Sequence, residues 1–170
     1  VSDLRLDSVK MASSAAAAAT GRDAVITMLP DGSTLRQVAA DIIPVMAAGS
    51  ALIDCSTVDV DSARDVAAMA GEAGLLAVDA PVSGGVGGAR SGSLTFMAGG
   101  PDAGFALAAP LFEIMGAKAV HCGGSGAGQA AKICNNMILG ATMIVTCEAF
   151  ALADGLGLDR QKMFDVVSTS

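Results

Sequence analysis

Short, uninterrupted apolar runs that alternate with helix-like segments are the feature that most constrains the fold of this chain. Apolar residues recur three and four positions apart over 35–47 and 59–73, as on the buried face of a helix, and Asp59 or Asp61 could cap the second helix. Strands that are apolar on both faces and alternate with helices predict a doubly wound α/β fold with a parallel sheet. The strand candidates are AVITML (24–29), ALIDC (51–55), LLAVDAPV (75–82), LTFMAGG (94–100) and AKAVHC (117–122).

The character of the chain changes after the last strand candidate. Residues 128–154 form one helical stretch that is apolar nearly all round, so we expect it to be buried along most of its length. Gly155 is expected to cap this helix, and a further helix is expected to begin near Asp159. We therefore predict that residues 1–122 belong to the α/β domain and that residues 123–170 begin an all-α domain.

Composition argues against several classes of partner. A net charge of −7 disfavours nucleic acid and anionic membranes, and a chain without Trp or Tyr is poorly suited to stack bases. The longest uncharged apolar run, 133–147, is shorter than the ~20 residues that span a bilayer. The cysteines have no metal-ligand spacing, so we predict no metal site and reduced, buried thiols at Cys55, Cys122, Cys134 and Cys147.

A glycine-rich turn precedes the long helix. Gly124, Gly126 and Gly128 are spaced much like the glycines that let a dinucleotide pyrophosphate approach a helix N-terminus. That arrangement requires a second strand after one short helix, whereas here a long helix is followed by another helix. The pattern therefore favours a different role, in which the glycines allow the helix to pack closely against the first domain and leave a cleft between the domains.

One lysine stands out on the long helix. Lys132 and Asn136 are four residues apart and share a helix face, among Ala, Ile, Cys and Met. A lysine in such surroundings reaches a cleft, pairs with an acid or has a lowered pKa, and it could then exchange protons with a substrate. A structural lysine that extends to the domain rim is the alternative that spacing leaves open. His121 ends a strand without a partner suggested by spacing, and we expect it to be structural.

Ser83, Gly84 and Gly85 predict a tight turn at the sheet edge where α/β folds bind ligands. The stretch that contains them closely resembles the substrate-binding signature of the 3-hydroxyisobutyrate dehydrogenase group in the β-hydroxyacid dehydrogenase family. Three other stretches resemble that family's catalytic-lysine segment and its cofactor-proximal loops, in the same order and spacing. The matching stretches are DAPVSGGVGGARSGSLTFMAGG (79–100), GAGQAAKICNNM (126–137), ITMLP (26–30) and LIDCSTVD (52–59).

The resemblance implies a role for each matched residue. Lys132 is similar to the lysine that exchanges the hydroxyl proton as hydride passes to the nicotinamide, and Asn136 to the amide that orients the substrate. Ser83, Gly84 and Gly85 resemble the turn that binds the substrate carboxylate. The positions that match residues lining the dinucleotide are Leu29, Pro30, Thr57 and Thr34. Relatives often have Asn at the position of Thr34.

The resemblance also implies an incomplete domain. We expect a partial Rossmann-type sheet whose first strand and glycine fingerprint precede residue 1, followed by the start of an all-α domain. The opening segment 3–19 is expected to be a helix that follows such a strand. The chain would then be an internal piece of a longer enzyme, and the piece alone could be inactive.

The implied activity is NAD-dependent oxidation of 3-hydroxyisobutyrate to methylmalonate semialdehyde, a step of valine catabolism, with NADP as the alternative cofactor. Another β-hydroxyacid dehydrogenase, such as tartronate semialdehyde (2-hydroxy-3-oxopropionate) reductase, is the first alternative function, and a non-catalytic scaffold is the second. The expected partner is a small β-hydroxyacid, with no nucleic acid or membrane, and the full-length protein is expected to be a homo-oligomer. Its expected location is the mitochondrial matrix in a eukaryote or the cytoplasm in a bacterium.

Overall fold

The computed structural model describes residues 9–170, which fall into two compact units that divide between Lys132 and Ile133. Residues 3–8 of the predicted opening helix lie outside the described part. In the described part the prediction is wrong for 9–14, because helix α1 covers only Ala15–Ala19. Ser14 sets that start, since its hydroxyl accepts a hydrogen bond from the Ala17 N–H at 3.1 Å.

The first unit is built on one sheet with the strand order β1-β2-β3-β5-β4, and β6 also pairs with β5. The first three strands are parallel, as predicted, whereas β5 runs antiparallel to β3 and β4 and parallel to β6. The predicted strand 75–82 is two strands, because Pro81 has no N–H for the ladder. The strands are β1 (Ala24–Thr27), β2 (Ala51–Asp54), β3 (Leu76–Asp79), β4 (Val82–Ser83), β5 (Leu94–Gly99) and β6 (Gly116–Gly123).

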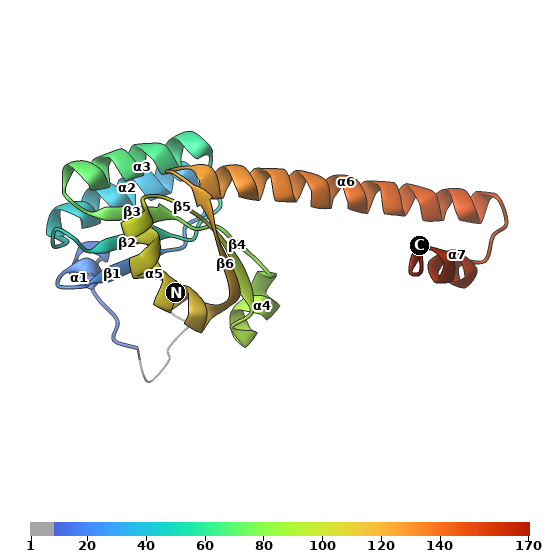
Figure 1. The fold of residues 1–170 in the computed structure, drawn as a ribbon, viewed down its shortest axis with the longest axis horizontal. Helices are drawn as coiled ribbons and strands as arrows, with labels where there is room; N and C mark the ends of the chain where they lie inside the picture. The colour runs from blue at the N-terminus through green and yellow to red at the C-terminus, as the bar shows by residue number, and fades with distance from the viewer. Residues whose placement is uncertain (1–8) are drawn as a thin grey trace. The chain divides into compact units, whose positions relative to one another are not determined.

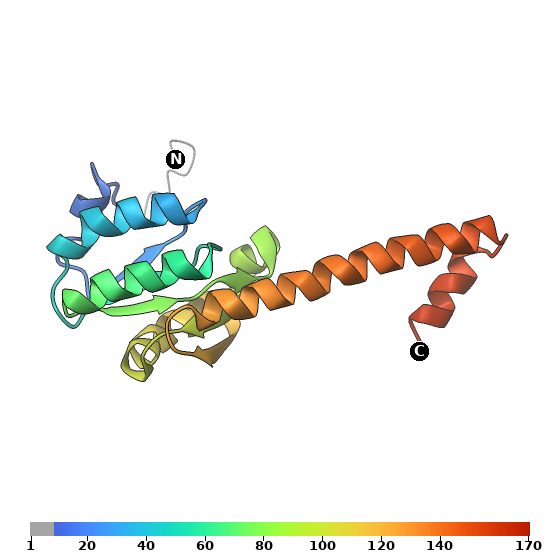
Figure 2. The same ribbon diagram turned by 90° about the horizontal axis from the view of Figure 1, so that it is seen from above.

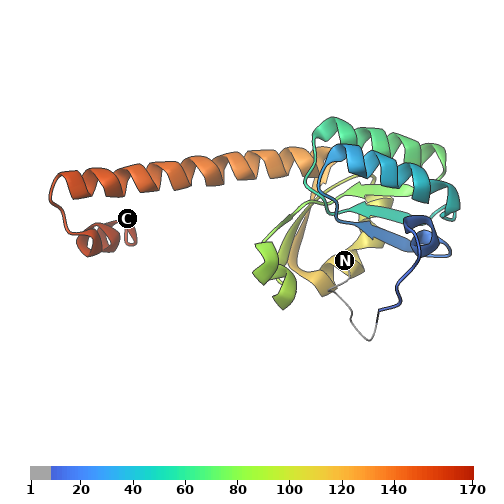
Figure 3. The ribbon, with the colours of Figure 1, turned by 180° about the vertical axis from the view of Figure 1, so that it is seen from behind.

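Helices cover both faces of this sheet. Helices α2 (Gly32–Ile42) and α3 (Val60–Glu72) lie side by side over one face, and α5 (Asp102–Met115) lies over the other (Figure 1, Figure 2, Figure 3). In β2, Leu52 packs into the core under α2 and α3, whereas its neighbour Ile53 packs into the core under α5. A strand buried on both faces needs apolar residues at successive positions, so the doubly wound fold predicted from the apolar runs is confirmed.

Two helices of the first unit were not predicted. Helix α4 (Gly85–Ser91) forms within the glycine-rich stretch that suggested only a turn, and it ends at Gly92 with φ of 62°. Helix α5 is apolar along most of its length, so no polar face marks it in the sequence. It also contains Pro110, a residue that normally interrupts a helix. A short 3-10 helix, Ile43–Val45, also follows α2.

The second unit contains the rest of α6 (Ala127–Gly155) and α7 (Arg160–Val167), which Asp159 caps through the Lys162 N–H. The expected cap at Gly155 is wrong, because the left-handed residue that ends α6 is Gly157, with φ of 75°. The Leu158 N–H reaches back to the Ala153 carbonyl at 2.9 Å, and the Gly157 N–H to the Asp154 carbonyl at 3.0 Å. This is the Schellman pattern.

The expectation that the long helix is buried is also wrong for this chain. Apolar side chains along α6 are exposed, among them Ile138 at 65% and Ile144 at 66%. The described residues of the second unit offer only the short α7 as a further element, which is too little apolar surface to cover a helix of this length. By length and composition alone, α6 is also the one described helix that could cross a membrane.

All four cysteines are free thiols, but only Cys55 is buried. Burial, with Asp54 alongside, raises the pKa of the Cys55 thiol to about 12, so this thiol stays protonated and unreactive. The expectation of buried thiols is wrong for Cys134 and Cys147, because both lie on the exposed part of α6, and Cys122 is partly exposed.

Candidate functional site

Buried polar side chains fix the loops that follow β1 and β2. Asp54 ends β2, and its Oδ1 accepts hydrogen bonds from the Thr27 hydroxyl at 2.7 Å and the Ser56 hydroxyl at 2.6 Å. The Ser56 hydroxyl in turn accepts the Leu29 N–H at 2.8 Å. The carboxyl ends of neighbouring parallel strands are therefore tied to each other at the edge where α/β folds bind ligands.

The residues matched to the dinucleotide site lie along this edge. Leu29 is half-buried, whereas Pro30 and Thr57 are exposed at the tips of the two tied loops. Thr34 lies in the first turn of α2, where its N–H donates to the helix-capping Asp31 at 2.8 Å. The structure thus brings Leu29, Pro30 and Thr57 into adjacent loops and leaves Thr34 in the helix that follows.

Asp79 connects the end of β3 to the start of α6. Its Oδ1 accepts the Gly126 N–H at 2.7 Å, and its Oδ2 accepts the Gln129 N–H at 2.9 Å. Burial is the main cause that raises the pKa of Asp79, and the hydrogen bonds from Gly126 and Gln129 oppose it. This carboxylate, distant in sequence, satisfies N–H groups that a helix start leaves without an intrahelical partner.

Gly126 and Gly128 have the packing role predicted for the turn, whereas Gly124 does not, because a side chain there would meet nothing within 4 Å. A side chain at Gly128 would collide with the backbone carbonyls of Met97 and Asp79, and one at Gly126 would lie 3.0 Å from Val60. Gly126 also has φ of 85°, which a side chain would strain. The start of α6 therefore lies directly against the sheet, and its N–H groups bind a carboxylate of the protein rather than standing free for a phosphate.

Gln129 joins the same helix start to the loop after β2. Its side chain is fully buried, and it accepts the Val58 N–H at 3.1 Å and donates to the Ser56 carbonyl at 2.8 Å. These two backbone groups flank Thr57. The helix that carries Lys132 is thus bonded to the loop that carries Thr57.

Lys132 lies beside the predicted substrate turn. Its ammonium donates to the Val82 carbonyl at 2.6 Å, and Val82 directly precedes Ser83. No carboxylate among residues 9–170 lies within ion-pair distance of this lysine, and partial burial lowers its pKa below the usual value. Gly84 and Gly85 follow with φ of 128° and 59°, which explains why glycines occupy the turn.

Asn136 lies one helical turn beyond Lys132 on α6, in the second compact unit, and is exposed. Its side-chain oxygen accepts a hydrogen bond of 3.5 Å from Asn135.

His121 stacks on Phe105, with ring centroids 4.8 Å apart, and its Nε2 lies 3.0 Å from the Gly100 carbonyl. These contacts support the structural role expected for His121.

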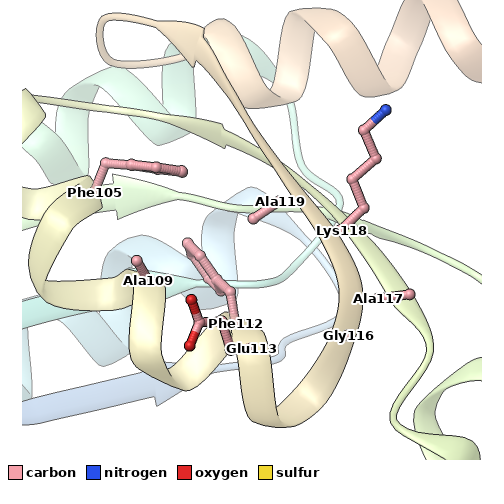
Figure 4. Close-up of a pocket in the computed structure, with 8 residues that line it drawn as sticks. All are labelled: Phe105, Ala109, Phe112, Glu113, Gly116, Ala117, Lys118 and Ala119. Carbon is pink, nitrogen blue, oxygen red and sulfur yellow. The ribbon is translucent and has the colours of Figure 1, made fainter.

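A pocket of about 400 Å³ lies elsewhere in the first unit, between α5 and β6 (Figure 4). Phe105, Ala109 and Phe112 line it from the helix, and the side chain of Lys118 points away from α5. None of the residues matched to the family motifs lines this pocket. The candidate site is therefore the loop edge around Lys132 and not the pocket between α5 and β6.

Sequence reasoning missed the residues that hold this edge together, namely Asp54, Ser56, Asp79 and Gln129. A signal existed for the carboxylates, because Asp54 and Asp79 each end an apolar strand run at a position where a charge needs a partner. Gln129 carried no comparable signal, because one amide in the first turn of a helix is unremarkable until its partners are known.

Comparisons with known proteins agree with these observations. A family model described as the NAD-binding domain of 6-phosphogluconate dehydrogenase matches residues 1–124. A second, described as NAD-binding of NADP-dependent 3-hydroxyisobutyrate dehydrogenase, matches residues 126–170.

Named relatives and solved structures point in the same direction. A probable 3-hydroxyisobutyrate dehydrogenase of Mycobacterium tuberculosis is 47% identical over 155 residues, which are 91% of this chain and 53% of that protein. The mitochondrial 3-hydroxyisobutyrate dehydrogenase of Mus musculus is 45% identical over 164 residues, 95% of this chain and 49% of that protein. The solved M. tuberculosis 3-hydroxyisobutyrate dehydrogenase with L-serine superimposes with a TM-score of 0.90 at 46% identity, covering 93% of this chain and 54% of that one.

The chain spans about half the length of the curated relatives it matches. Over that half, the Rossmann-type fold implied by the motifs is confirmed by both the family model and the solved structure. The family model covers most of the sequence, and the relatives named above share one enzyme name. The chain therefore belongs to the family of the 6-phosphogluconate dehydrogenase NAD-binding domain, and its resemblance to the 3-hydroxyisobutyrate dehydrogenases of that family is confirmed.

Proposed function

We propose that the full-length protein is a 3-hydroxyisobutyrate dehydrogenase that oxidises its substrate to methylmalonate semialdehyde, with NAD or NADP as hydride acceptor. The observation that carries the proposal is Lys132, which is half-buried, has no ion-pair partner among residues 9–170 and is bonded to the residue that precedes Ser83. A lysine held in this way, beside a glycine turn that can bind a carboxylate, suits proton exchange with a hydroxyacid.

The described residues fit one end of a dinucleotide. Leu29, Pro30 and Thr57 offer a partly apolar surface with one hydroxyl at the carboxyl ends of β1 and β2, which suits the nicotinamide end. The pyrophosphate end has no cradle in residues 9–170. The helix starts of α2, α3 and α6 already donate N–H groups to the carboxylates of Asp31, Asp59 and Asp79.

Lys132 is proposed as the general base of the oxidation. Its neutral amine accepts the proton of the substrate hydroxyl as the carbon gives up hydride, and its ammonium returns the proton in the reverse direction. The nicotinamide, when bound, accepts that hydride. The lowered pKa of Lys132 increases the share of neutral amine at a given pH, and the bond to the Val82 carbonyl fixes its direction.

The turn at Ser83 is proposed to hold the substrate. The Ser83 hydroxyl and the N–H groups of Gly84 and Gly85 can donate to a carboxylate, and the glycines allow it to approach the backbone closely. Asn136, one turn beyond Lys132 on α6, is proposed to orient the substrate through its amide. A β-hydroxyacid has a carboxylate two bonds from the hydroxyl carbon, which matches a site with one carboxylate-binding turn and one proton acceptor.

We also propose the domain assignment, with a dinucleotide-binding domain up to 122 and a helical substrate domain from 123. Helix α6 is assigned to that second domain rather than to a membrane, because Lys132, Asn136 and Glu148 are distributed along it. The full-length protein is proposed to be a homo-oligomer that acts on a small-molecule substrate. It would lie in the mitochondrial matrix in a eukaryote and in the cytoplasm in a bacterium.

Turnover of the full-length protein on a panel of β-hydroxyacids tests the function. We expect 3-hydroxyisobutyrate to have a higher kcat/KM than glycerate, with NAD or NADP as acceptor. Faster turnover of glycerate would instead identify a tartronate semialdehyde reductase. Cofactor binding without turnover of any member of the panel would favour a non-catalytic scaffold.

A further inference from the structure

Gln129 makes contacts that the proposed reaction does not use directly. It is fully buried in the first turn of α6, three residues before Lys132, so both side chains lie on neighbouring parts of the helix surface. One side-chain amide accepts the Val58 N–H at 3.1 Å and donates to the Ser56 carbonyl at 2.8 Å. It thus binds the backbone on both sides of Thr57.

The two bonds are specific to an amide. The Val58 N–H needs an acceptor and the Ser56 carbonyl needs a donor, and a glutamine supplies both in one planar group. The position is buried, so the loss of either bond would leave a polar backbone group without a partner. The loop that carries Thr57 therefore has one favoured position relative to the start of α6.

The start of α6 is also bonded to the residues at and after the end of β3. Asp79 holds the N–H groups of Gly126 and Gln129, and Lys132 is bonded to the Val82 carbonyl. The segment 126–132 thus joins the loop after β2 to the turn after β3. These are the segments that carry the residues matched to cofactor and to substrate.

We propose that Gln129 is a positioning residue that fixes the Thr57 loop relative to the Lys132 amine, and so aligns the cofactor's nicotinamide with the substrate hydroxyl. The inference rests on the proposed function, in that Thr57 contacts the cofactor and Lys132 the substrate. Gln129 itself touches neither. Its effect is geometric, and a displacement of 1 Å between reacting groups can cost about 100-fold in rate.

Two substitutions in the full-length protein separate positioning from folding. Gln129→Met keeps the length of the side chain but makes neither bond. Gln129→Glu keeps an acceptor for the Val58 N–H, but its ionised form faces the Ser56 carbonyl with a second acceptor. When protonated, this glutamic acid can make both bonds again. Burial raises the pKa of this carboxyl above the usual ~4.3, so it becomes protonated at a higher pH than an exposed glutamate does. Gln37→Met, at an exposed position on α2, is the matched control.

We expect Gln129→Met to bind NADH with full stoichiometry and to keep KM within about threefold, while kcat falls by about 10- to 100-fold. The activity of Gln129→Glu relative to wild type should rise as the pH falls through the pKa of the new carboxyl. The relative activities of Gln129→Met and Gln37→Met should not change with pH. A purely structural role would lower the melting temperature, the cofactor stoichiometry and kcat together, without a return of activity at low pH.

Amide hydrogen exchange at Val58 gives a readout that needs no turnover. Exchange should be about fivefold faster or more in Gln129→Met, because a typical hydrogen bond contributes about 1 kcal/mol. Unchanged exchange would show that Gln129 does not hold the loop. Faster exchange with an unchanged kcat would overturn the positioning role. If wild type turns over no β-hydroxyacid, the proposed function fails, and Val58 exchange still decides whether Gln129 fixes the loop.

Discussion

At the scale of single residues, the environment of Lys132 gives the clearest link between sequence and chemistry. An apolar helix face lowers the pKa of the amine through burial, and the Val82 carbonyl holds it at the start of the Ser83 turn. The ionised form keeps only part of its hydration there, so the neutral form is more accessible than for a solvated lysine. Charge state and position are thus set by different contacts.

Replacement of Lys132 tests the proposed base. In the full-length enzyme, Lys132→Ala should lower kcat by about 100-fold or more, because general bases contribute about 10²–10⁴-fold, while cofactor affinity stays near wild type. Ser83→Ala should act mainly on KM, since a carboxylate contact that is equal in ground and transition states is uniform binding. Steady-state kinetics and NADH titration measure both. If Lys132→Ala retained more than half of the wild-type kcat, the lysine would not be the base.

The lowered pKa of Lys132 predicts the direction of the pH profile. Oxidation needs the neutral amine, so kcat/KM should rise with pH and level off above the lysine's folded-state pKa, which lies below the ordinary 10.5. Burial favours the neutral form in the folded state, so this residue's contribution to stability should also rise with pH between the folded pKa and 10.5. Reduction of the semialdehyde should show the opposite trend in rate. A rise in oxidation rate that persisted in Lys132→Ala would assign the titration to another group.

At the scale of elements, the start of α6 explains what could and could not be predicted from the sequence. The parallel strands β1 to β3 were predictable because burial on both faces leaves continuous apolar runs. The antiparallel course of β5 and the helix α5 were not, because strand direction depends on tertiary pairing and α5 lacks a polar face. Among site residues, Lys132 and the Ser83 turn were recognisable as motifs. The roles of Asp79 and Gln129 depend on partners about 50 and 70 residues away.

A substitution at Gly128 tests the packing role of the glycine turn. A methyl group there would collide with the carbonyls of Met97 and Asp79, so Gly128→Ala should destabilise the protein by about 1–3 kcal/mol. Gly124→Ala is the matched control, since a methyl group at Gly124 would have no neighbour within 4 Å. Calorimetry of the full-length variants should show a lower melting temperature for Gly128→Ala only. Equal stability of the two variants would contradict close packing at the start of α6.

At the scale of the whole molecule, the proposal assigns to the described residues the substrate turn, the lysine and one end of the cofactor site. They do not supply a site for the cofactor's phosphates. Three helix starts face the ligand edge or lie close to it, and each is occupied by an aspartate of the chain itself. A dinucleotide draws much of its affinity from its pyrophosphate at such a helix start. The occupied helix starts therefore predict weak dinucleotide binding by the 170-residue chain.

The 170-residue chain is expected to bind NADH poorly or not at all. In the proposed site Leu29, Pro30 and Thr57 contact only the nicotinamide end. The N–H groups of Gly126 and Gln129 cannot donate to a phosphate while they donate to Asp79. Calorimetric titration with NADH should show no saturation up to about 1 mM, a binding free energy weaker than about 4 kcal/mol.

Circular dichroism and sedimentation on the same sample establish that the chain is folded and dispersed. This control is necessary because apolar side chains along α6 are exposed and favour aggregation. The full-length protein should bind NADH under the same conditions. Micromolar binding by the 170-residue chain would mean that one of these helix starts does receive the pyrophosphate. If that start is the one of α6, Asp79→Asn, which removes the competing charge there, would tighten the binding.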